Sequence, residues 1–457
     1  MKLIDSYKNK NVLVFGAGLS GTNAAKLLIK LGANVTLTDG KKLEEITDHQ
    51  ELSDLGVNIV AGQSPLSLLD GTDLMVKNPG IPYDVALVKA AEEKQIPIIV
   101  EVELASEVAE APIVAVTGSN GKTTTTTMIS EMLSAGKSAG TAYKAGNIGI
   151  SATQVAEKAT KNDEIVMEVS SFMLLGITKF HPKIAVITNI FENHLDYHKT
   201  RENYVNAKLN ITKNQDEKDF LVINFDTAEW RKLSERSRAQ VVPFSANGEF
   251  KTGAYQLAGK LYYQDEFIMD ATDIRVPGEH NVENALAAIA VAKISGVATS
   301  KIVKILKNFG GVRHRNQYVL TANGRQFYND SKATDIEATQ MAIEGFKQPV
   351  VLIAGGLDRG YTFEKLEKDF QEHLSGIVLY GQTQKLLEKS AIAAGIKNIK
   401  LVDNLDEAVP VAYEMSKPGD IVLLSPANAS WDQFASFEER GDQFIKDVEK
   451  ITGKKEE

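Results

Sequence analysis

With 457 residues, the chain is too long for a single hydrophobic core, and we expect two to four domains. A hydrophobic fraction of 43%, a charged fraction of 24% and a formal net charge of −9 are typical of a globular protein and argue against a nucleic-acid surface, which is normally basic. The absence of cysteine excludes disulfides, thiolate catalysis and thiolate metal sites. No apolar run reaches the ~18 residues of a membrane span, and the N-terminus lacks the apolar core of a signal peptide, so we expect a cytoplasmic protein without membrane contact.

The first hundred residues have the pattern of a nucleotide-binding half-fold. A strand is predicted at Asn11–Phe15, then a G-x-G-x-x-G turn at Gly16–Gly21 and a helix over Thr22–Leu31. The next strand, Asn34–Thr38, ends at Asp39, where such folds place an acid on a ribose hydroxyl. The pattern predicts binding of a nucleotide diphosphate. By itself it leaves open a nicotinamide-dependent dehydrogenase.

A further turn follows the apolar run Leu74–Val76. Its sequence, NPGIP at Asn78–Pro82, can cap the same crevice or be an ordinary turn. The segment Glu101–Pro112 is acidic and rich in alanine, as in a helix followed by a linker. We therefore predict a Rossmann-like first domain over residues 1–100.

A second glycine turn occurs about a hundred residues after the first. Ile113–Val116 is predicted to be a buried strand, and Gly118–Lys122 opens a helix. Backbone N–H groups at a helix N-terminus favour an anion. Lys122 could then reach the outer phosphates of a nucleotide, and Thr123 could offer its hydroxyl to magnesium. Because Val116 stands where the P-loop pattern has its first glycine, a plain strand-to-helix turn remains an alternative.

Two later loops of this central region carry polar side chains. Asn147 lies in the loop GNIG, and Glu168 interrupts the apolar strand Glu164–Val169. A carboxylate at a strand end near a phosphate loop suits magnesium, although Glu168 can also be a paired structural acid. His194 and His198 are four residues apart, but no glutamate follows the first histidine, which disfavours a zinc hydrolase.

Lys208 is the most unusual residue of the central region. In the helical segment Glu202–Lys213, Tyr204 and Ile211 lie four residues before and three after it, so the lysine shares their apolar face. It can extend outwards to water, or it can point inwards. Pointing inwards, it would lose part of its charge by desolvation, and its neutral amine could add carbon dioxide to become a carbamate.

The central domain is predicted to end at a hinge. Asn281 and Asn284 precede an alanine-rich helix, Ala285–Ile294, and share one face, so that one can contact a nucleotide while Asn281 can equally cap the helix. After the glycine pair in Phe309–Val312 the composition changes. We therefore predict a central ATPase domain over residues 101–311 and a last domain over residues 312–457.

The last domain is predicted to contain another parallel sheet. Three apolar strands, separated by helical patterns, lie at Val350–Ala354, Gly376–Gly381 and Ile421–Leu424. Ser436–Glu439 has the pattern of a capping box and would begin the final helix. The predicted fold class is thus α/β with three domains: a Rossmann-like first domain, a central P-loop-type mononucleotide-binding domain and a Rossmann-like C-terminal domain.

Eight segments of the chain resemble the motifs of the Mur ligase family, in the family's order and over essentially the whole length. They are TGSNGKTT, GNIG, EVSSF, NHLDYH, YVNAK, GEHNVENALAA, NDSKAT and SPANASWDQFASFEERG, of which the last resembles most closely the D-glutamate-adding branch. The resemblance implies ATP-dependent amide formation between UDP-N-acetylmuramoyl-L-alanine and D-glutamate, through an acyl phosphate, in cytoplasmic peptidoglycan precursor synthesis. It also implies magnesium and a carbamate on Lys208, and we expect a monomer.

The resemblance assigns roles to individual residues. For ATP it implies Gly118, Ser119, Asn120, Gly121, Lys122, Thr123, Thr124, Asn284, Arg315, Asp330 and Lys332. For the metal it implies Thr123, Glu168, His194 and Lys208. For catalysis it implies Lys122, Glu168, His194 and Lys208. For UDP it implies Leu19, Ser20, Asp39 and Gly40, with Asn147 and Ser170 near the muramoyl-alanine. For D-glutamate it implies Thr334, Arg359, Ser430 and Phe437. Arg359 stands where some members have lysine, and Ser119 where threonine is usual.

Other functions remain to be weighed against this one. A nicotinamide-dependent dehydrogenase would leave the second glycine turn and Lys208 unexplained. A regulatory module that senses UDP-sugars would leave the metal-ligand set idle. Within the family, another amino-acid ligase or a folate polyglutamate synthetase is the nearest competitor, and the first domain and SPANASWDQF disfavour the folate enzyme.

Overall fold

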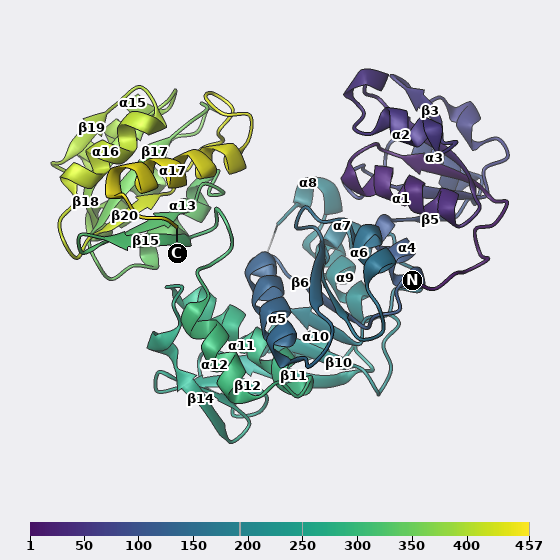
Figure 1. Ribbon diagram of the computed structural model, residues 1–457, viewed down its shortest axis with the longest axis horizontal. Coiled ribbons are helices and arrows are strands. Elements are labelled where there is room, and N and C mark those ends of the chain that lie inside the picture. Colours follow the sequence, from purple (N-terminus) through teal and green to yellow (C-terminus); the bar gives the residue numbers. More distant parts are fainter. Residues whose placement is uncertain (192, 249, 457) are drawn as a thin grey trace. The chain divides into compact units, whose positions relative to one another are not determined.

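The structure, a computed structural model, describes residues 1–191, 193–248 and 250–456. The chain divides into two compact units: Met1–Ala271 with Glu283–Leu306, and Thr272–Val282 with the residues from Lys307 onward. Within the described residues, two sheets belong to the first unit and one to the second (Figure 1). The predicted α/β class with three sheet-bearing parts is confirmed.

The first sheet is parallel and has the strand order β3-β2-β1-β4-β5. Its elements are β1 (Asn11–Phe15), α1 (Leu19–Lys30), β2 (Asn34–Asp39), η1 (Leu43–Glu45), α2 (His49–Asp54), β3 (Asn58–Ala61), η2 (Leu66–Leu69), β4 (Leu74–Lys77), α3 (Ala86–Glu93) and β5 (Ile98–Ile99). Helix α1 begins three residues earlier than predicted, inside the glycine motif. Gly21 packs so closely on the first turn that a Cβ there would lie 1.9 Å from the carbonyl oxygen of Gly16.

The second sheet has nine strands in the order β14-β13-β12-β11-β10-β9-β6-β8-β7. Its strands are β6 (Ile113–Thr117), β7 (Ala142–Gly146), β8 (Glu164–Glu168), β9 (Ile184–Ile187), β10 (Phe220–Asn224), β11 (Gln240–Ser245), β12 (Ala254–Leu257), β13 (Lys260–Tyr263) and β14 (Glu266–Asp270). The strands from β7 to β12 pair in parallel, whereas β13 and β14 are antiparallel additions at the edge. The region after β10, which the sequence pattern left unplaced, supplies this extension.

Helices and short turns alternate with the strands of the second sheet along the chain and follow its last strand. They are α4 (Glu101–Val108), α5 (Lys122–Gly136), α6 (Ala152–Lys158), α7 (Ser171–Leu174), α8 (Leu195–His198), α9 (Arg201–Leu209), η3 (Asn210–Thr212), α10 (Ala228–Ser234), η4 (Ala271–Asp273), α11 (Glu279–Ile294) and α12 (Thr299–Asn308). The predicted helix Glu202–Lys213 is therefore an α-helix that ends at Leu209 and continues as a 3₁₀ turn. Helix α11 begins at Glu279, so Asn281 lies in its first turn and is not the N-cap.

The third sheet has the order β15-β16-β20-β17-β18-β19 and is parallel except for the β15–β16 hairpin. Its elements are β15 (Gln317–Ala322), β16 (Arg325–Asn329), α13 (Ile336–Glu344), β17 (Val350–Gly355), η5 (Glu364–Leu366), α14 (Glu367–His373), β18 (Leu374–Tyr380), α15 (Gln384–Ala393), β19 (Ile399–Leu401), α16 (Leu405–Met415), β20 (Ile421–Leu424) and α17 (Phe437–Thr452). Ser436 caps α17 by accepting a hydrogen bond from the backbone N–H of Glu439, as the sequence predicted.

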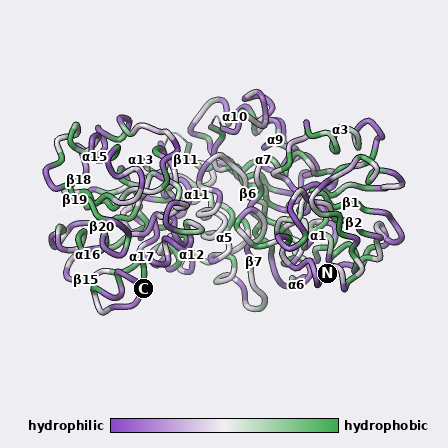
Figure 2. The backbone as a smooth tube through the Cα atoms, turned by 90° about the horizontal axis from the view of Figure 1, so that it is seen from above, coloured by the Kyte–Doolittle hydropathy of each residue, from purple (hydrophilic) through white to green (hydrophobic). Residues whose placement is uncertain are grey.

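The strands are apolar because most are covered on both faces. Figure 2 shows hydrophobic residues along the strands of the sheets, including β1 and β6, and β6, β17 and β20 consist entirely of buried residues. Such continuous apolar runs are typical of parallel sheets flanked by helices. None of the helices in the described part of the chain is sufficiently long and apolar to cross a membrane.

Candidate active site

The glycine turn after β6 is shaped by close contacts that only glycine permits. Gly118 has φ +152°, and a Cβ there would lie 1.9 Å from Thr188 Oγ1. Gly121 has φ +79°, and its Cβ would lie 2.1 Å from Asn284 Oδ1. The turn ends at Lys122, where α5 begins (Figure 1). The N–H groups of that first helical turn have no acceptors inside the helix, so they face the position of an anion.

Asn189 holds this phosphate loop (Gly118–Lys122) in shape. Its Oδ1 accepts hydrogen bonds from the backbone N–H groups of Ser119 and Asn120, at 3.1 and 2.8 Å. Thr188 Oγ1 donates to the carbonyl oxygen of Asn120 at 2.6 Å. Lys122 Nζ folds back onto the carbonyl oxygens of Gly118 and Ser119, at 3.0 and 2.8 Å. The lysine therefore stands beside the loop, within reach of an anion placed there.

Lys208 points inwards, which resolves the choice that the sequence left open. Its side chain is 2% exposed, and Nζ donates to the carbonyl oxygen of Gly118 at 2.6 Å. It also lies over the Tyr204 ring, 4.6 Å from the centroid. Burial, and then the charge of Lys122, lower the pKa of Lys208 well below that of an ordinary lysine. Its burial next to the phosphate loop thus disfavours the charged form of the amine.

Glu168 is the last residue of β8. In the sheet, β8 lies next to β6, and β9 lies on the other side of β6. Its side chain is 1% exposed, and Oε1 accepts a hydrogen bond from Asn147 Nδ2 at 2.8 Å. The second oxygen, Oε2, is buried without a hydrogen-bond partner in the described chain. A buried carboxylate oxygen left without a partner is costly, and a cation would satisfy it. Glu168 is therefore not fully paired as a structural acid.

The histidine pair lies at a short helix after β9. His194 precedes α8 with φ +54°, and its ring is 5.0 Å from the Phe172 ring. His198 is buried, and its Nε2 is 2.9 Å from Ser171 Oγ. Across the described residues, no three His, Cys, Asp or Glu side chains gather closely enough to hold a metal ion by themselves. The zinc-hydrolase alternative thus finds no ligand set there.

The first glycine motif forms a second turn, separate from the phosphate loop, at the carboxyl ends of β1, β2 and β4. Asp39 holds its neighbours: one carboxylate oxygen accepts from the Ala17 N–H at 2.6 Å and the other from the Lys41 N–H at 2.9 Å. Leu19 is 52% exposed at the start of α1. Ser20 Oγ is 3.4 Å from Asn78 Nδ2, which brings the turn Asn78–Pro82 to the glycine motif.

In the second unit, polar side chains gather at the carboxyl ends of β16, β17 and β20. Asp330 is buried and accepts hydrogen bonds from the Asn316 N–H and Ser425 Oγ, both at 2.9 Å. Burial raises the pKa of Asp330 to about 7. Lys332 Nζ lies over the Phe437 ring at 5.1 Å, and Arg315 has a buried Nε without a hydrogen-bond partner in the described residues.

Sequence reasoning did not single out Arg440, which connects two of these loops. This arginine is fully buried and donates to Ser331 Oγ, to the Ser331 carbonyl and to the Asn428 carbonyl, at 3.0, 2.8 and 3.0 Å. Ser331 Oγ in turn donates to the Phe437 carbonyl at 2.8 Å. The loops that carry Ser430 and Thr334 are thereby held together. Backbone carbonyls of distant residues accept two of the Arg440 hydrogen bonds, so no pattern of residue types in the sequence predicts them.

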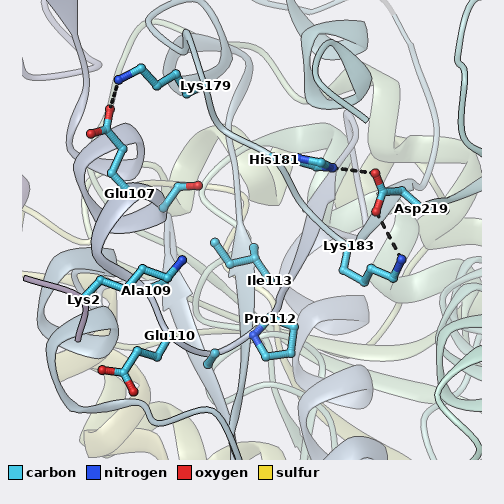
Figure 3. Close-up of a pocket in the computed structure, with 12 residues that line it drawn as sticks. Lys2, Glu107, Ala109, Glu110, Pro112, Ile113, Lys179, His181, Lys183 and Asp219 are labelled. Atoms are coloured by element: carbon cyan, nitrogen blue, oxygen red, sulfur yellow. Dashed lines mark hydrogen bonds and ion pairs between the residues drawn. The ribbon is translucent and has the colours of Figure 1, made fainter. Parts of the chain in front are cut away.

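A different cavity lies at the opposite end of β6 from the phosphate loop. It has a volume of about 520 Å³ and is lined by the N-terminal end of β6, the chain before it and charged residues around His181 (Figure 3). Several of its charged side chains already have partners: Lys179 pairs with Glu107 at 3.4 Å, and Asp219 accepts from His181 at 2.5 Å and from Lys183 at 3.3 Å. This cavity is distinct from the phosphate loop.

Comparison with known protein families accounts for nearly the whole chain. Residues 10–100 match the Mur ligase MurD-like N-terminal domain, residues 116–292 the Mur ligase middle domain and residues 314–428 the Mur ligase glutamate ligase domain. The chain belongs to the Mur ligase family. The family membership agrees with the resemblance of the sequence motifs and replaces the dehydrogenase alternative.

Individual Mur ligases are similar over their full length. An enzyme of Lactiplantibacillus plantarum named UDP-N-acetylmuramoylalanine--D-glutamate ligase is 57% identical over 458 residues, covering 100% of both chains. One of the same name from Ligilactobacillus salivarius is 56% identical, again over 100% of both. Among solved structures, MurC from Thermotoga maritima has a TM-score of 0.59 at 20% identity, covering 97% of this chain and 99% of the other. MurF from Acinetobacter baumannii has a TM-score of 0.59 at 19% identity, covering 96% and 93%. The two structures support the fold.

Proposed function

We propose that this Mur ligase joins D-glutamate to UDP-N-acetylmuramoyl-L-alanine, using ATP, in the synthesis of peptidoglycan precursors. The observation that carries the proposal is the full-length similarity, at 57% identity, to an enzyme named UDP-N-acetylmuramoylalanine--D-glutamate ligase. The two separate glycine crevices support it physically. One suits the uridine diphosphate of the carrier and the other suits the phosphates of ATP.

The reaction proceeds in two displacements. A carboxylate does not react with an amine at neutral pH, so a carboxylate oxygen of the L-alanine first attacks the γ-phosphorus of ATP, and ADP leaves. The amine of D-glutamate, having lost a proton, then attacks the acyl carbon, and phosphate leaves as the amide forms. Catalysis of such phosphoryl transfer depends mainly on positioning and charge neutralisation.

The phosphate loop would hold ATP. Its N–H groups and the N-terminus of α5 would bind the phosphates, and Lys122 would leave the Gly118 and Ser119 carbonyls to meet the outer phosphate. Asn284 lies beside Gly121, accepts a hydrogen bond from Thr125 Oγ1 at 3.1 Å, and would bind ATP there. The full set proposed for ATP is Gly118, Ser119, Asn120, Gly121, Lys122, Thr123, Thr124, Asn284, Arg315, Asp330 and Lys332.

The residues around Glu168 fit a magnesium ion. The unsatisfied Oε2 of Glu168 is an oxygen of the kind that magnesium prefers, and Thr123 is the second residue of α5, directly after the loop. Bound magnesium would supply neutralisation of the phosphate charge. Lys208 would contribute as a carbamate, and the burial that lowers its pKa shifts the balance towards the neutral amine that this addition requires. We propose Thr123, Glu168, His194 and carbamylated Lys208 as the metal-supporting set.

The organic substrates would occupy the remaining predicted residues. Leu19, Ser20, Asp39 and Gly40 would hold UDP, and Asn147 and Ser170 would lie near the muramoyl-alanine. Thr334, Arg359, Ser430 and Phe437 would position D-glutamate. Arg440 supports this last assignment because it holds together the loops that carry Ser430 and Thr334.

The organisation of the chain completes the proposal. We place the uridine-binding domain at residues 1–100, the ATPase domain at 101–311 and the amino-acid domain at 312–457. We further propose that the enzyme acts as a cytoplasmic monomer on small molecules, with no nucleic-acid or membrane partner.

Phosphate release from ATP tests the function. The full chain is incubated with magnesium, ATP and UDP-N-acetylmuramoyl-L-alanine, and then with D-glutamate, L-glutamate or L-lysine. We expect release only with D-glutamate. Release with L-lysine instead would assign the chain to another amino-acid-adding ligase, and ATP hydrolysis that needs no uridine substrate would contradict the proposal.

A further inference from the structure

Lys77 is a buried lysine for which the proposed reaction has no use. It is the last residue of β4, its side chain is 1% exposed, and no carboxylate of the described chain lies within ion-pair distance of it. A buried cation without a counter-charge is costly to a fold. Burial lowers the pKa of Lys77 to about 8.

The partners of Lys77 are the carbonyl oxygens of one turn. Nζ donates to the carbonyl of Ile81 at 2.6 Å and to that of Asn78 at 3.2 Å, and it is 3.5 Å from that of Pro79. It also lies over the ring of Tyr83, 4.5 Å from the centroid. One ammonium group therefore gathers the inward-facing carbonyls of the turn Asn78–Pro82.

That turn packs directly against the first glycine motif, where we propose that the uridine diphosphate binds and which we call the first glycine crevice. A Cβ on Gly16 would lie 2.7 Å from Asn78 Cβ and 3.0 Å from Ile81 Cδ1, so the turn is in direct contact with the glycine motif. The backbone N–H of Asn78 donates to the Phe15 carbonyl at 2.8 Å. Any displacement of the turn would change the shape of the crevice where the phosphates would lie.

A second donor reaches the same turn from the other sheet of the first unit. Tyr197, on α8, has its hydroxyl 3.2 Å from the Ile81 carbonyl and 3.4 Å from the Pro79 carbonyl. The Ile81 carbonyl thus accepts from both Lys77 and Tyr197. Helix α8 follows His194, so the turn is connected to the segment that carries the histidine pair.

We propose that Lys77 and Tyr197 are positioning residues for the uridine diphosphate carrier: together they fix the Asn78–Pro82 turn against the glycine motif and so shape its crevice. This inference rests on the proposed function, because it takes that crevice to be the uridine site. It concerns two residues outside the set that would touch the carrier. Lys77 acts through three backbone carbonyls and Tyr197 through two of the same three.

Calorimetric titration of the full chain with UDP tests the inference. Lys77→Met keeps the length of the side chain and removes its donors, and we expect it to weaken UDP binding by at least about tenfold, the loss of one charge-assisted hydrogen bond. Lys77→Arg, which keeps charge and donors, should recover most of this loss. Tyr197→Phe removes only the hydroxyl and should weaken binding by about two- to fivefold.

A matched control and a second ligand separate positioning from general damage. Lys94→Met removes an exposed lysine of the same domain, paired with Asp70 at 2.7 Å, and should leave UDP binding unchanged. In the variants at Lys77 and Tyr197, KM for the uridine substrate should rise while kcat and the affinity for an ATP analogue stay at the wild-type values. A parallel loss of ATP-analogue affinity would show general damage and overturn the inference.

Failure of the inference is distinguishable from failure of the proposed function. If the wild-type chain binds UDP and Tyr197→Phe and Lys77→Met bind it equally well, the inference is wrong and the function stands. If Lys77→Met does not fold, Tyr197→Phe decides the matter by the same comparison. If the wild-type chain binds no UDP, the proposed function itself fails.

Discussion

Replacing Lys208 tests the link between its burial and catalysis. Its Nζ donates to the Gly118 carbonyl at 2.6 Å, and burial and Lys122 together lower its pKa well below the ordinary value. A hydrogen bond from a neutral amine contributes about 1 kcal/mol to stability, against about 1.5–3 kcal/mol from a charged one. Because burial disfavours the charged form here, we expect the loss to lie nearer the smaller figure.

Lys208→Met should therefore separate stability from activity. Methionine has a similar length and can pack on the Tyr204 ring, so we expect the free energy of unfolding to change by less than about 2 kcal/mol. Turnover should fall by at least about 100-fold, the loss of about 2.7 kcal/mol of transition-state stabilisation. Thermal melting and phosphate release measure the two effects.

Chemical rescue distinguishes a carbamate from a plain lysine. Lys208→Ala leaves space in which added formate or acetate can replace the carboxylate-like group, and we expect partial recovery of turnover. Lys208→Met fills that space and should not respond. Lys213→Met, at an exposed lysine just after the same helical segment, is the control and should keep full activity. Full activity of Lys208→Ala without any additive would refute the reasoning.

Three further changes test other parts of the site. Glu168→Gln should leave the protein folded, because Asn147 can still donate a hydrogen bond to the remaining side-chain oxygen. Magnesium-dependent phosphate release should fall by at least about 100-fold. Undiminished phosphate release would show that Glu168 is not part of the metal site. Gly118→Ala places a Cβ 1.9 Å from Thr188 Oγ1. In calorimetry we expect it to weaken binding of an ATP analogue by at least about tenfold and to leave UDP binding unchanged. ATP-analogue binding as tight as in the wild type would contradict the geometry of the loop. The carboxyl of Asp330 keeps its proton to about pH 7 in the fold but loses it near pH 4 when unfolded, so stability should fall as pH rises between these values, by at most about 4 kcal/mol. Asp330→Asn should abolish that part of the pH dependence in thermal melts, and an unchanged pH profile would argue against a buried, protonated Asp330.

The elements that position the two glycine turns could be predicted from the sequence because local pattern decides them. Continuous apolar runs identified β1, β6, β8 and β20, and the glycine spacing identified the turns that follow two of them. The inward direction of Lys208 was foreseeable as one of two possibilities, since Tyr204 and Ile211 mark its face as apolar. The cap at Ser436 followed from its spacing to Glu439.

What the sequence missed depends on contacts between distant segments. Asn189 supports the phosphate loop from 70 and 69 residues away, and Arg440 reaches Ser331 across 109 residues. Apart from Ser331 Oγ, their partners are backbone groups, which leave no trace in residue type. Helix α1 begins early because Gly21 packs on Gly16, a contact between the first and last glycines of a motif that was taken for a turn throughout.

The segment after β10 was unplaced for another reason. Strands β12, β13 and β14 are short and partly exposed, and β13 and β14 pair antiparallel, so they lack the continuous apolar run of a central parallel strand. Asn281 was a candidate cap, but α11 begins two residues earlier, and its Nδ2 donates to the Pro277 carbonyl at 2.6 Å. In both cases the tertiary setting decided between local alternatives.

The proposed function requires one chain to bind uridine and adenine nucleotides at two independent glycine turns. The most direct test is calorimetric titration of the full chain with UDP, first alone and then with a non-hydrolysable ATP analogue at saturation. We predict one UDP site whose dissociation constant is not weakened by the analogue and is also unchanged in Gly118→Ala. Competition between the two nucleotides for a single site, or loss of UDP binding in Gly118→Ala, would contradict the account.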